Sequence, residues 1–320
     1  MALASPCDHI YIALCTYQAE RFIVPQIDSI LAQSHQNFSI NIFDDCSDDA
    51  TLSIISHYQQ ANTNIYLHIN SSCVGFVKNF EQAITTLSSK GAYIALCDQD
   101  DLWHEDKLAL GLHALKSSEK MYPKKPVLVH SDLRLIDEEG CCIHGSFFTQ
   151  KRIALPAEKS LAKILGYNGV MGNTLMMNNQ LAKLALPFPD ALKYHDYWLA
   201  LVNEVFGVRM TLNQRLVDYR IHQHNASENR APKQTDVKKR PQRPFTADNR
   251  AETLAYFLRH YELEDSDREV VEAFCNYLNQ NKNRFSTVLL LLRYSFLRRD
   301  WRYRLRVFRR LIFGLYHQPE

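Results

Sequence analysis

The sequence predicts an α/β fold with a mainly parallel central sheet, flanked by helices and followed by a helical C-terminal extension. Short apolar runs rich in strand-forming residues alternate with segments that carry apolar residues at helical spacing. Polar clusters follow several of these runs directly. Since parallel strands need connections of helical length, and ligands bind beyond their carboxyl ends, we expect a binding site at that edge of the sheet.

The N-terminal third of the chain carries the clearest alternation. His9–Cys15 is the first expected strand, and Ala19–Gln33 follows as a helix because its apolar residues recur at helical spacing. The same pattern predicts strands at 38–43, 65–69, 93–97 and 127–130, and helices at 50–60, 76–87 and 105–120.

The rest of the chain is predicted in less detail. Ser131–Phe148 is a hairpin or a connection that turns at Glu139–Gly140, and 161–177 holds a glycine-containing segment. We expect a helix at 196–206, a strand at 215–219, and helices at 251–259, 267–279 and 287–315. Residues 230–244 have three prolines and six basic residues against one acid, which indicates a linker. The expected domains are therefore 1–228 and a helical region at 250–320, joined by a linker at 229–249.

Composition disfavours several classes of protein. The 320 residues are 46% hydrophobic, which allows a full core and argues against general disorder. None of the eight cysteines forms a C-x-x-C pair, and Cys15 and Cys97 lie in apolar runs, so we interpret the cysteines as small buried side chains. The absence of a dinucleotide fingerprint, a P-loop and a nucleophile elbow disfavours dinucleotide oxidoreductases, P-loop enzymes and α/β-hydrolases.

Three acids in four residues, Asp98, Asp100 and Asp101, directly follow the strand expected at 93–97. Carboxylates this close repel one another, and oxygen ligands of this kind suit Mg²⁺ or Mn²⁺. A divalent cation held here can bridge a diphosphate and neutralise the charge of a departing nucleotide. The alternative is a solvated loop that caps the helix near Trp103.

A second acidic cluster, at 44–49, follows the strand expected at 38–43. Its later acids suit the start of the next helix, where backbone N–H groups favour negative charge. The functional interpretation gives Asp45 or Asp44 a hydrogen bond from the ring N–H of a pyrimidine base.

Taken together, these segments resemble the family 2 glycosyltransferases, which have the GT-A fold. The matching residues are IALCTYQAERFIVPQIDSILAQS (12–34), INIFDDCSDDAT (40–51), NSSCVGFVKNFEQA (70–83) and YIALCDQDDLWHEDK (93–107). A second set is similar to the branch that includes rhamnosyltransferases and other builders of bacterial surface polysaccharides (O-antigen or capsule): HSDLRLIDEEG (130–140), GVMGNTLMMN (169–178), ALPFPDALKYHDYWLAL (185–201) and LVDYRIHQHNAS (216–227). The resemblance covers roughly residues 8–228.

The resemblance implies an inverting hexosyltransferase that uses a nucleotide-diphosphate sugar, Mn²⁺ or Mg²⁺, and a saccharide acceptor. Asp98 and Asp100 would form the D-x-D pair, with Asp100 the closer metal ligand. The other implied roles are a nucleotide pocket lined by Thr16, Tyr17 and Glu20, a base contact from Asp45, a base or ribose contact from Lys78 and Asn79, and a loop of Gly172, Asn173 and Thr174 near donor sugar and acceptor. This branch has a small residue or Cys at the middle position of that loop, so Asn173 is a departure that bears on donor or acceptor choice.

The resemblance also implies a general base and a late site histidine. Asp196 would take the proton of the acceptor hydroxyl, which is a weak nucleophile at neutral pH. The alternatives are that Asp196 only stabilises a helix start, or that His195 is the base. His222 would complete the metal or diphosphate site, and His224 is an alternative.

The C-terminal tail is basic. Between 284 and 310 it holds nine arginines and one acid, interleaved with large apolar residues. This pattern favours an amphipathic helix on an anionic membrane surface, near a lipid-linked acceptor, and the alternative is a helix packed on the catalytic domain. No run approaches the ~20 apolar residues that span a bilayer, and no signal peptide is recognised, so we expect a cytoplasmic protein bound to the inner face of the membrane.

Three other functions compete with a rhamnosyltransferase. The chain can instead transfer another hexose such as glucose, galactose or N-acetylglucosamine, because these motifs encode the donor sugar poorly. A sugar nucleotidyltransferase would normally need a glycine-rich basic loop after the first strand, and CTYQAER has no glycine. A catalytically inactive membrane-associated scaffold would not need the retained acids. No nucleic-acid-binding module is recognised, so nucleic acid is not an expected partner.

Overall fold

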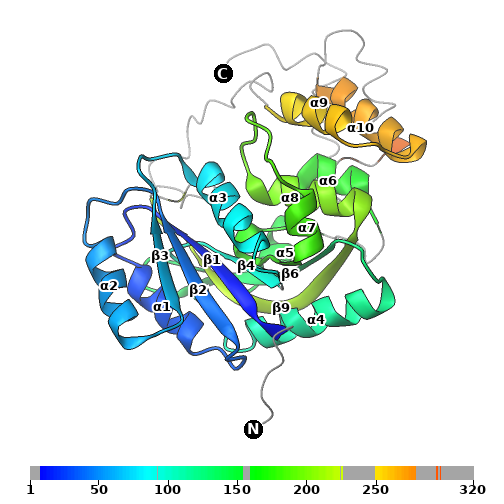
Figure 1. Cartoon of the computed structure of the whole chain (residues 1–320). Helices are drawn as coiled ribbons and strands as arrows, with labels where there is room; N and C mark the ends of the chain where they lie inside the picture. Colours follow the sequence, from blue (N-terminus) through cyan, green and yellow to red (C-terminus); the bar gives the residue numbers. More distant parts are fainter. Residues whose placement is uncertain are drawn as a thin grey trace, which may run out of the picture. The chain divides into compact units, whose positions relative to one another are not determined.

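The structure is a computed structural model that describes residues 8–91, 93–153, 159–223, 225, 249–278, 293–294 and 296. Its described part contains one nine-stranded sheet in the order β3-β2-β1-β4-β8-β6-β9-β5, with β7 paired to β6 (Figure 1). The strands are β1 (Ile10–Thr16), β2 (Phe38–Asp44), β3 (Ile65–Ile69), β4 (Tyr93–Cys97), β5 (Leu102–Trp103), β6 (Val127–Ile136), β7 (Cys142–His144), β8 (Met176–Asn178) and β9 (Val208–Arg220).

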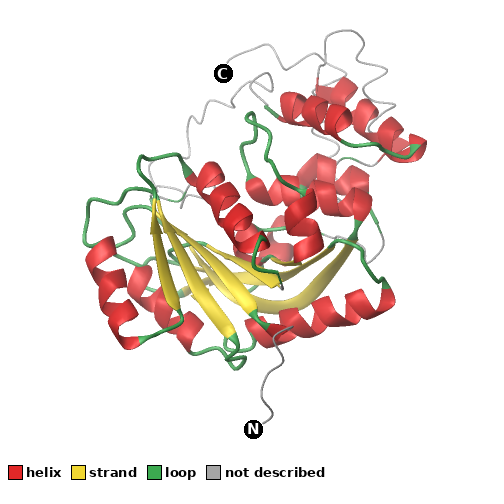
Figure 2. Cartoon of the chain, in the orientation of Figure 1, coloured by secondary structure: helices red, strands yellow, loops and turns green. Residues whose placement is uncertain are grey.

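The sheet is mixed and largely parallel. β1 pairs in parallel with β2 and β4, β2 with β3, and β6 with β9, whereas β8 is antiparallel to both of its neighbours. Helices lie on both sides of the sheet (Figure 2). The expected α/β fold with a flanked parallel sheet is therefore confirmed. Its helices are α1 (Ile23–Leu31), α2 (Thr51–Ala61), α3 (Phe76–Ser88), α4 (Lys107–Met121), α7 (Asn179–Leu184) and α8 (His195–Phe206).

Two strands and one helix differ in length from the prediction. β6 continues past His130 to Ile136, and β9 begins at Val208, because the two strands pair with each other along this length, where polar and apolar residues are mixed. α1 begins at Ile23 instead of Ala19. The N–H groups of Ala19 and Glu20 are instead held by the side chains of Thr51 (2.7 Å) and Asp49 (3.1 Å).

The chain forms two compact units. The first comprises the residues up to Phe147 together with Val170–Phe188 and Tyr194–Arg220, and it contains the sheet. The second comprises Phe148–Gly169, Pro189–Lys193 and the described residues from Ile221 onward. The expected boundary after residue 228 remains a prediction.

The regular secondary structure described in the second unit is helical. Phe296 packs on Phe274, with ring centroids 4.9 Å apart, and Lys159 pairs with Asp267 at 2.5 Å. Most of the expected linker and of the basic tail lies outside the described residues. The helices expected at 251–259 and 267–279 are confirmed as α9 (Arg250–His260) and α10 (Asp265–Leu278), and the unit also holds α6 (Leu161–Tyr167) and most of α5 (Phe147–Lys151).

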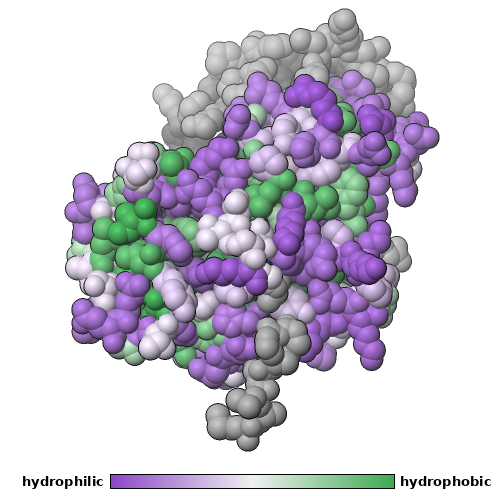
Figure 3. All heavy atoms as spheres, in the orientation of Figure 1, coloured by the Kyte–Doolittle hydropathy of each residue, from purple (hydrophilic) through white to green (hydrophobic). Residues whose placement is uncertain are grey.

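The molecular surface carries no large apolar expanse on the face seen in Figure 3, where apolar residues gather in small groups among hydrophilic ones. Within the described residues, no helix has both the length and the apolar character needed to cross a bilayer. Cys15 and Cys97 are buried as expected, but Cys73, Cys141 and Cys142 are exposed, so burial explains only some of the cysteines.

Candidate functional site

The carboxyl ends of β2, β1 and β4 lie side by side and bring the acidic clusters together. β1 is central, and its register pairs Thr16 with Asp44 on one side and Leu14 with Cys97 on the other. Asp45 and Asp98 are the residues that follow β2 and β4. The prediction that polar clusters gather at one edge of the sheet is thereby confirmed.

Asp44 ties the first two strand ends together. Its buried carboxylate accepts hydrogen bonds from the Thr16 hydroxyl (2.7 Å), the Ser47 hydroxyl (2.7 Å) and the Ser47 N–H (2.8 Å). Thr16 is itself 2% exposed. Both side chains therefore hold the edge of the site in shape, while the neighbouring Tyr17 is 48% exposed.

Tyr17 is held through its backbone and Glu20 through its carboxylate. Gln99 holds Tyr17 with two hydrogen bonds, accepting from its N–H (2.7 Å) and donating to its carbonyl (3.0 Å). The Glu20 carboxylate accepts from the N–H of Ala50, which precedes α2, at 2.9 Å. Their predicted contacts with a nucleotide remain predictions. Gln99 is given no role in the sequence analysis, although its position between Asp98 and Asp100 indicates that it lies at the site.

The Asp45 carboxylate is saturated by the segment 70–75. It accepts from the N–H groups of Val74 and Gly75 (both 2.8 Å), from the Asn70 amide (2.9 Å) and from the Cys73 thiol (3.2 Å). Burial alone would raise the pKa of Asp45, but these hydrogen bonds outweigh it and lower that pKa from 3.8. Asp45 is therefore an ionised anchor for this segment, and its predicted base contact remains a prediction.

Lys78 and Asn79 lie on the first turn of α3. Asn79 donates to the Phe43 carbonyl (2.8 Å) and accepts from Asn70 (3.1 Å), so it supports the segment that Asp45 holds. Lys78 pairs with Glu81 at 2.9 Å and remains 42% exposed. Of the two, Lys78 has the side chain that solvent, and hence a ligand, reaches.

The acidic turn after β4 is electrostatically strained. Burial, the Asp100 carboxylate and the Asp196 carboxylate together raise the pKa of Asp98 to about 7. Part of the Asp98 side chain remains accessible, so it lines the site instead of lying under it. Asp98, Asp100 and Asp196 are thus close enough to interact by charge, although β4 and α8 are far apart in the chain.

Asp101 connects this turn to two other segments. It accepts from the Asn173 amide (2.5 Å) and from the Arg220 N–H (3.0 Å), while the Arg220 guanidinium donates to the Asp100 carbonyl (2.9 Å). The sequence did not assign roles to Asp101 or Arg220. The departure at Asn173 has a physical reason, because this buried side chain reaches the Asp101 carboxylate.

Asp196 begins α8 and contacts the glycine-bearing turn. Its carboxylate accepts from the Tyr197 N–H at 2.6 Å and from the Gly172 N–H. Burial nevertheless outweighs these bonds and raises the pKa of Asp196 to about 6. A side chain at Gly172 would collide with His195, since a Cβ there would lie 2.6 Å from its Nε2. The turn Gly172–Thr174 is thus packed directly against the start of α8.

His195 is enclosed. It is 6% exposed and stacks on Phe80 with centroids 4.0 Å apart, and neither ring nitrogen has a hydrogen-bond partner in the described structure. Burial lowers the pKa of His195 to about 3. His195 is therefore neutral at physiological pH.

His222 belongs to the second unit. Its side chain is buried, and its N–H donates to Asn225 at 2.5 Å. The alternative, His224, lies outside the described residues. The predicted metal role of His222 remains a prediction.

The acids suit a divalent cation that needs only one or two protein ligands. Among the described residues, no three His, Cys, Asp or Glu side chains are arranged as a complete metal site. Mg²⁺ and similar ions, however, are commonly held by one or two carboxylates, with substrate phosphates and water completing the shell. Asp98 and Asp100 supply such a pair, and a cation would relieve the repulsion that raises the pKa of Asp98.

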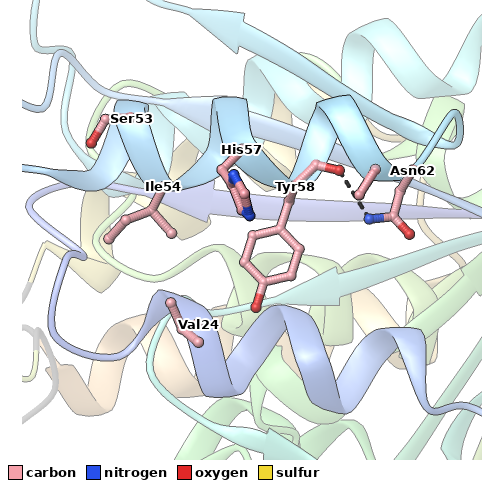
Figure 4. A pocket seen from close by; sticks show the side chains of 7 residues that line it. Val24, Ser53, Ile54, His57, Tyr58 and Asn62 are labelled. Carbon is pink, nitrogen blue, oxygen red and sulfur yellow. Dashed lines mark hydrogen bonds between the residues drawn. The ribbon is translucent and has the colours of Figure 1, made fainter.

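A groove between α1 and α2 offers a contrasting surface. It is lined by Val24 of α1 and by Ile54, His57 and Tyr58 of α2 (Figure 4). It contains no carboxylate and none of the predicted site residues. The candidate site is therefore the acidic edge of the sheet.

Comparison with protein families identifies the catalytic scaffold. Residues 11–122, which include the ends of β1, β2 and β4, match the family model of glycosyl transferase family 2. The chain is a glycosyltransferase. This glycosyltransferase therefore has its D-x-D turn, Asp98–Asp100, and its Asp45 anchor inside the matched region.

Two curated relatives and one solved structure extend the match. TuaG of Bacillus subtilis, a glycosyltransferase assigned to teichuronic acid biosynthesis, is 28% identical over 67% of this chain and 80% of its own. WfaP of Escherichia coli, a UDP-Glc:α-D-GlcNAc-diphosphoundecaprenol β-1,3-glucosyltransferase, is 25% identical over 69% and 80%. The mannosyltransferase PcManGT of Pyrobaculum calidifontis, solved with GDP-Man and Mn²⁺, has a TM-score of 0.54 at 16% identity over 96% of this chain and 81% of its own, which shows the shared fold.

Proposed function

We propose that this glycosyltransferase moves a sugar from a nucleotide-diphosphate sugar to an acceptor hydroxyl, with inversion, during assembly of a bacterial surface polysaccharide. The observation that supports it most is the proximity of Asp98 to Asp100 and Asp196, because burial together with the charges of Asp100 and Asp196 raises the pKa of Asp98. A cluster of acids at one edge of the sheet suits a cation, a pyrophosphate and a proton acceptor together.

Asp196 is the proposed general base. As the acceptor oxygen forms its bond to the anomeric carbon, Asp196 takes the hydroxyl proton, and the bond from that carbon to the diphosphate oxygen breaks with its electron pair. A pKa of about 6 leaves Asp196 ionised at neutral pH and well matched to proton transfer. His195 is the weaker candidate, because its ring nitrogens are buried and its pKa is about 3.

Asp98 and Asp100 are the proposed holders of Mn²⁺ or Mg²⁺, which would neutralise the charge that develops on the departing diphosphate. The Mn²⁺ in the structure of PcManGT supports this choice of ion. Arg220 and Asn173 position the acidic turn through the Asp100 carbonyl and the Asp101 carboxylate. His222 stays a candidate further ligand.

The partners are proposed from the relatives and the sequence. WfaP acts on a lipid-diphosphate-linked sugar, and TuaG is assigned to a surface polymer, so we propose a lipid-linked saccharide acceptor. The basic C-terminal tail would then bring the enzyme to the inner face of the membrane. Rhamnose remains one candidate donor sugar beside glucose, galactose and N-acetylglucosamine.

The test is nucleotide release from a panel of UDP-, dTDP- and GDP-sugars with Mn²⁺ or Mg²⁺. We expect one donor to release nucleotide in wild type only when metal is present, and Asp100→Asn to remove that activity while keeping the wild-type melting temperature. Release that persists without metal and in Asp100→Asn would overturn the metal assignment. Pyrophosphate release from a nucleoside triphosphate and a sugar phosphate would instead identify a nucleotidyltransferase.

A further inference from the structure

Four aromatic rings gather at the start of α8, just before Asp196 in the chain, and we call Phe76, Phe80, Tyr194 and His195 the aromatic cluster. Phe80 and His195 are buried and stacked. Phe76 lies 6.5 Å from Tyr194 and 6.2 Å from His195 between ring centroids. The cluster thus joins the first turn of α3 to the residues that lead into Asp196.

Phe76 differs from the buried rings because it is 41% exposed. Isolated exposed apolar residues are common, but this ring lies 6.2 Å from the ring of His195, the residue that directly precedes Asp196. Tyr194 is half-buried beside it. An accessible aromatic face packed near the start of the helix that carries Asp196 matches the two-sided chemistry of a sugar, whose C–H groups are apolar and whose hydroxyls are polar.

The backbone before Phe76 is unusually well held. Gly75 has a φ of +84°, and its N–H donates to Asp45 at 2.8 Å. Val74 donates to the same carboxylate. The Asp45 anchor therefore fixes the position from which Phe76 projects, and such preorganisation reduces the ordering cost of binding.

We propose that Phe76 and Tyr194 form the platform for the acceptor sugar, which stacks a pyranose C–H face on them and presents a hydroxyl to Asp196. This inference rests on the proposed function and adds to it the acceptor-binding residues. The occupant is a saccharide ring and not the lipid portion of the acceptor, because the cluster leads directly into Asp196 and contains an imidazole and a phenol, whereas a lipid chain needs an apolar surface alone.

The experiment uses full-length enzyme, the donor that wild type accepts, and N-acetylglucosamine linked through α-diphosphate to an octyl chain as the acceptor probe. We expect Phe76→Leu to raise the acceptor KM about tenfold, which corresponds to about 1.4 kcal/mol, while the donor KM changes less than about twofold. Phe76→Tyr keeps an aromatic face and should restore the acceptor KM. Tyr122→Leu, which removes an exposed aromatic residue after α4, is the matched control and should leave both constants unchanged.

An unchanged acceptor KM in Phe76→Leu, or an equal loss in Phe76→Tyr, would overturn the platform. Saturation-transfer NMR on wild type provides a measurement that needs no variant: the N-acetylglucosamine ring protons should be the most strongly saturated. Strongest saturation of the octyl protons, or full competition by octyl diphosphate without sugar, would assign the surface to lipid and overturn the proposal. Failure of wild type to release nucleotide from any donor would instead count against the proposed function.

Discussion

Asp45 and Asp98 follow neighbouring strands at the same edge of one sheet, yet their surroundings drive their pKa values in opposite directions. Four hydrogen bonds outweigh burial at Asp45 and lower its pKa. Burial and nearby carboxylates raise the pKa of Asp98 to about 7, and burial raises that of Asp196 to about 6. The contrast separates an acid that anchors the fold, Asp45, from acids that we propose to bind a cation or a proton, Asp98 and Asp196.

The largest expected effect is on Asp196, the proposed base. Asp196→Asn should lower the transfer rate by roughly 10²–10⁴-fold, the usual contribution of general base catalysis. The amide oxygen can still accept from Gly172 and Tyr197, so the melting temperature should not fall. Initial rates at saturating donor and thermal unfolding provide the check, with Asp8→Asn, which affects only a surface pair with Lys116, as the control. Wild-type rates in Asp196→Asn would remove the base assignment.

Asp45→Asn should reverse this pattern by costing mainly stability. An amide oxygen cannot replace both carboxylate oxygens toward Val74, Gly75 and Asn70, so we expect the free energy of unfolding to fall by about 2–3 kcal/mol. Urea unfolding measures the change. A variant as stable as wild type would show that the hydrogen bonds to Asp45 are not an anchor.

Gly172→Ala tests how tightly the glycine turn meets α8. The added Cβ would lie 2.6 Å from His195 Nε2, and His195 cannot retreat easily because it stacks on Phe80. We expect a loss of about 1–3 kcal/mol in unfolding free energy, as for other overpacked sites. Adding His195→Ala should recover part of that loss, and strictly additive effects in the double variant would contradict the contact.

The smallest expected effect is a pair of opposite pH dependences, measured in EDTA. Asp45 has a lowered folded pKa, so its stabilisation is present above about pH 4 and is lost as the pH falls through that pKa. Asp196 has a raised folded pKa, so wild type should lose stability as the pH rises from about 4 to about 6. At neutral pH, where both differences from wild type are largest, Asp45→Asn should therefore be less stable than wild type. Asp196→Asn should be at least as stable as wild type. If both variants were less stable than wild type at neutral pH, the contrast between Asp45 and Asp196 would be refuted.

The positions of the acids could be predicted from the sequence, but their roles could not. An apolar run that ends at charged residues indicates where a strand reaches the edge of the sheet, and this pattern alone predicts that Asp45 and Asp98 lie at that edge. The saturation of Asp45 depends on a segment 25–30 residues away and on the left-handed conformation of Gly75. Such a contact leaves no periodic signal in the chain.

Long-range contacts also explain the residues that the sequence analysis missed. Asp101 accepts hydrogen bonds from Asn173 and Arg220, which are 72 and 119 positions away in the chain. Nothing in the local sequence around Asp100 and Asp101 therefore indicates that the two acids have different roles. The exposure of Phe76 was hidden for a similar reason. Its helix pattern matches that of the buried Phe80, and only the tertiary packing distinguishes the two: Phe80 stacks on His195 at 4.0 Å between centroids, whereas Phe76 lies 6.2 Å from it.

The most direct test of the contrast is a ¹³C carboxyl titration of aspartate-labelled enzyme, first in EDTA and then with Mg²⁺, with Asp45→Asn, Asp98→Asn and Asp196→Asn used for assignment. We predict that Asp98 titrates near 7 and Asp196 near 6, that Asp45 titrates below 3.8, and that Mg²⁺ moves the Asp98 titration to lower pH without affecting Asp45. Titration of all three acids near the ordinary value of 3.8, with no response to Mg²⁺, would contradict the account.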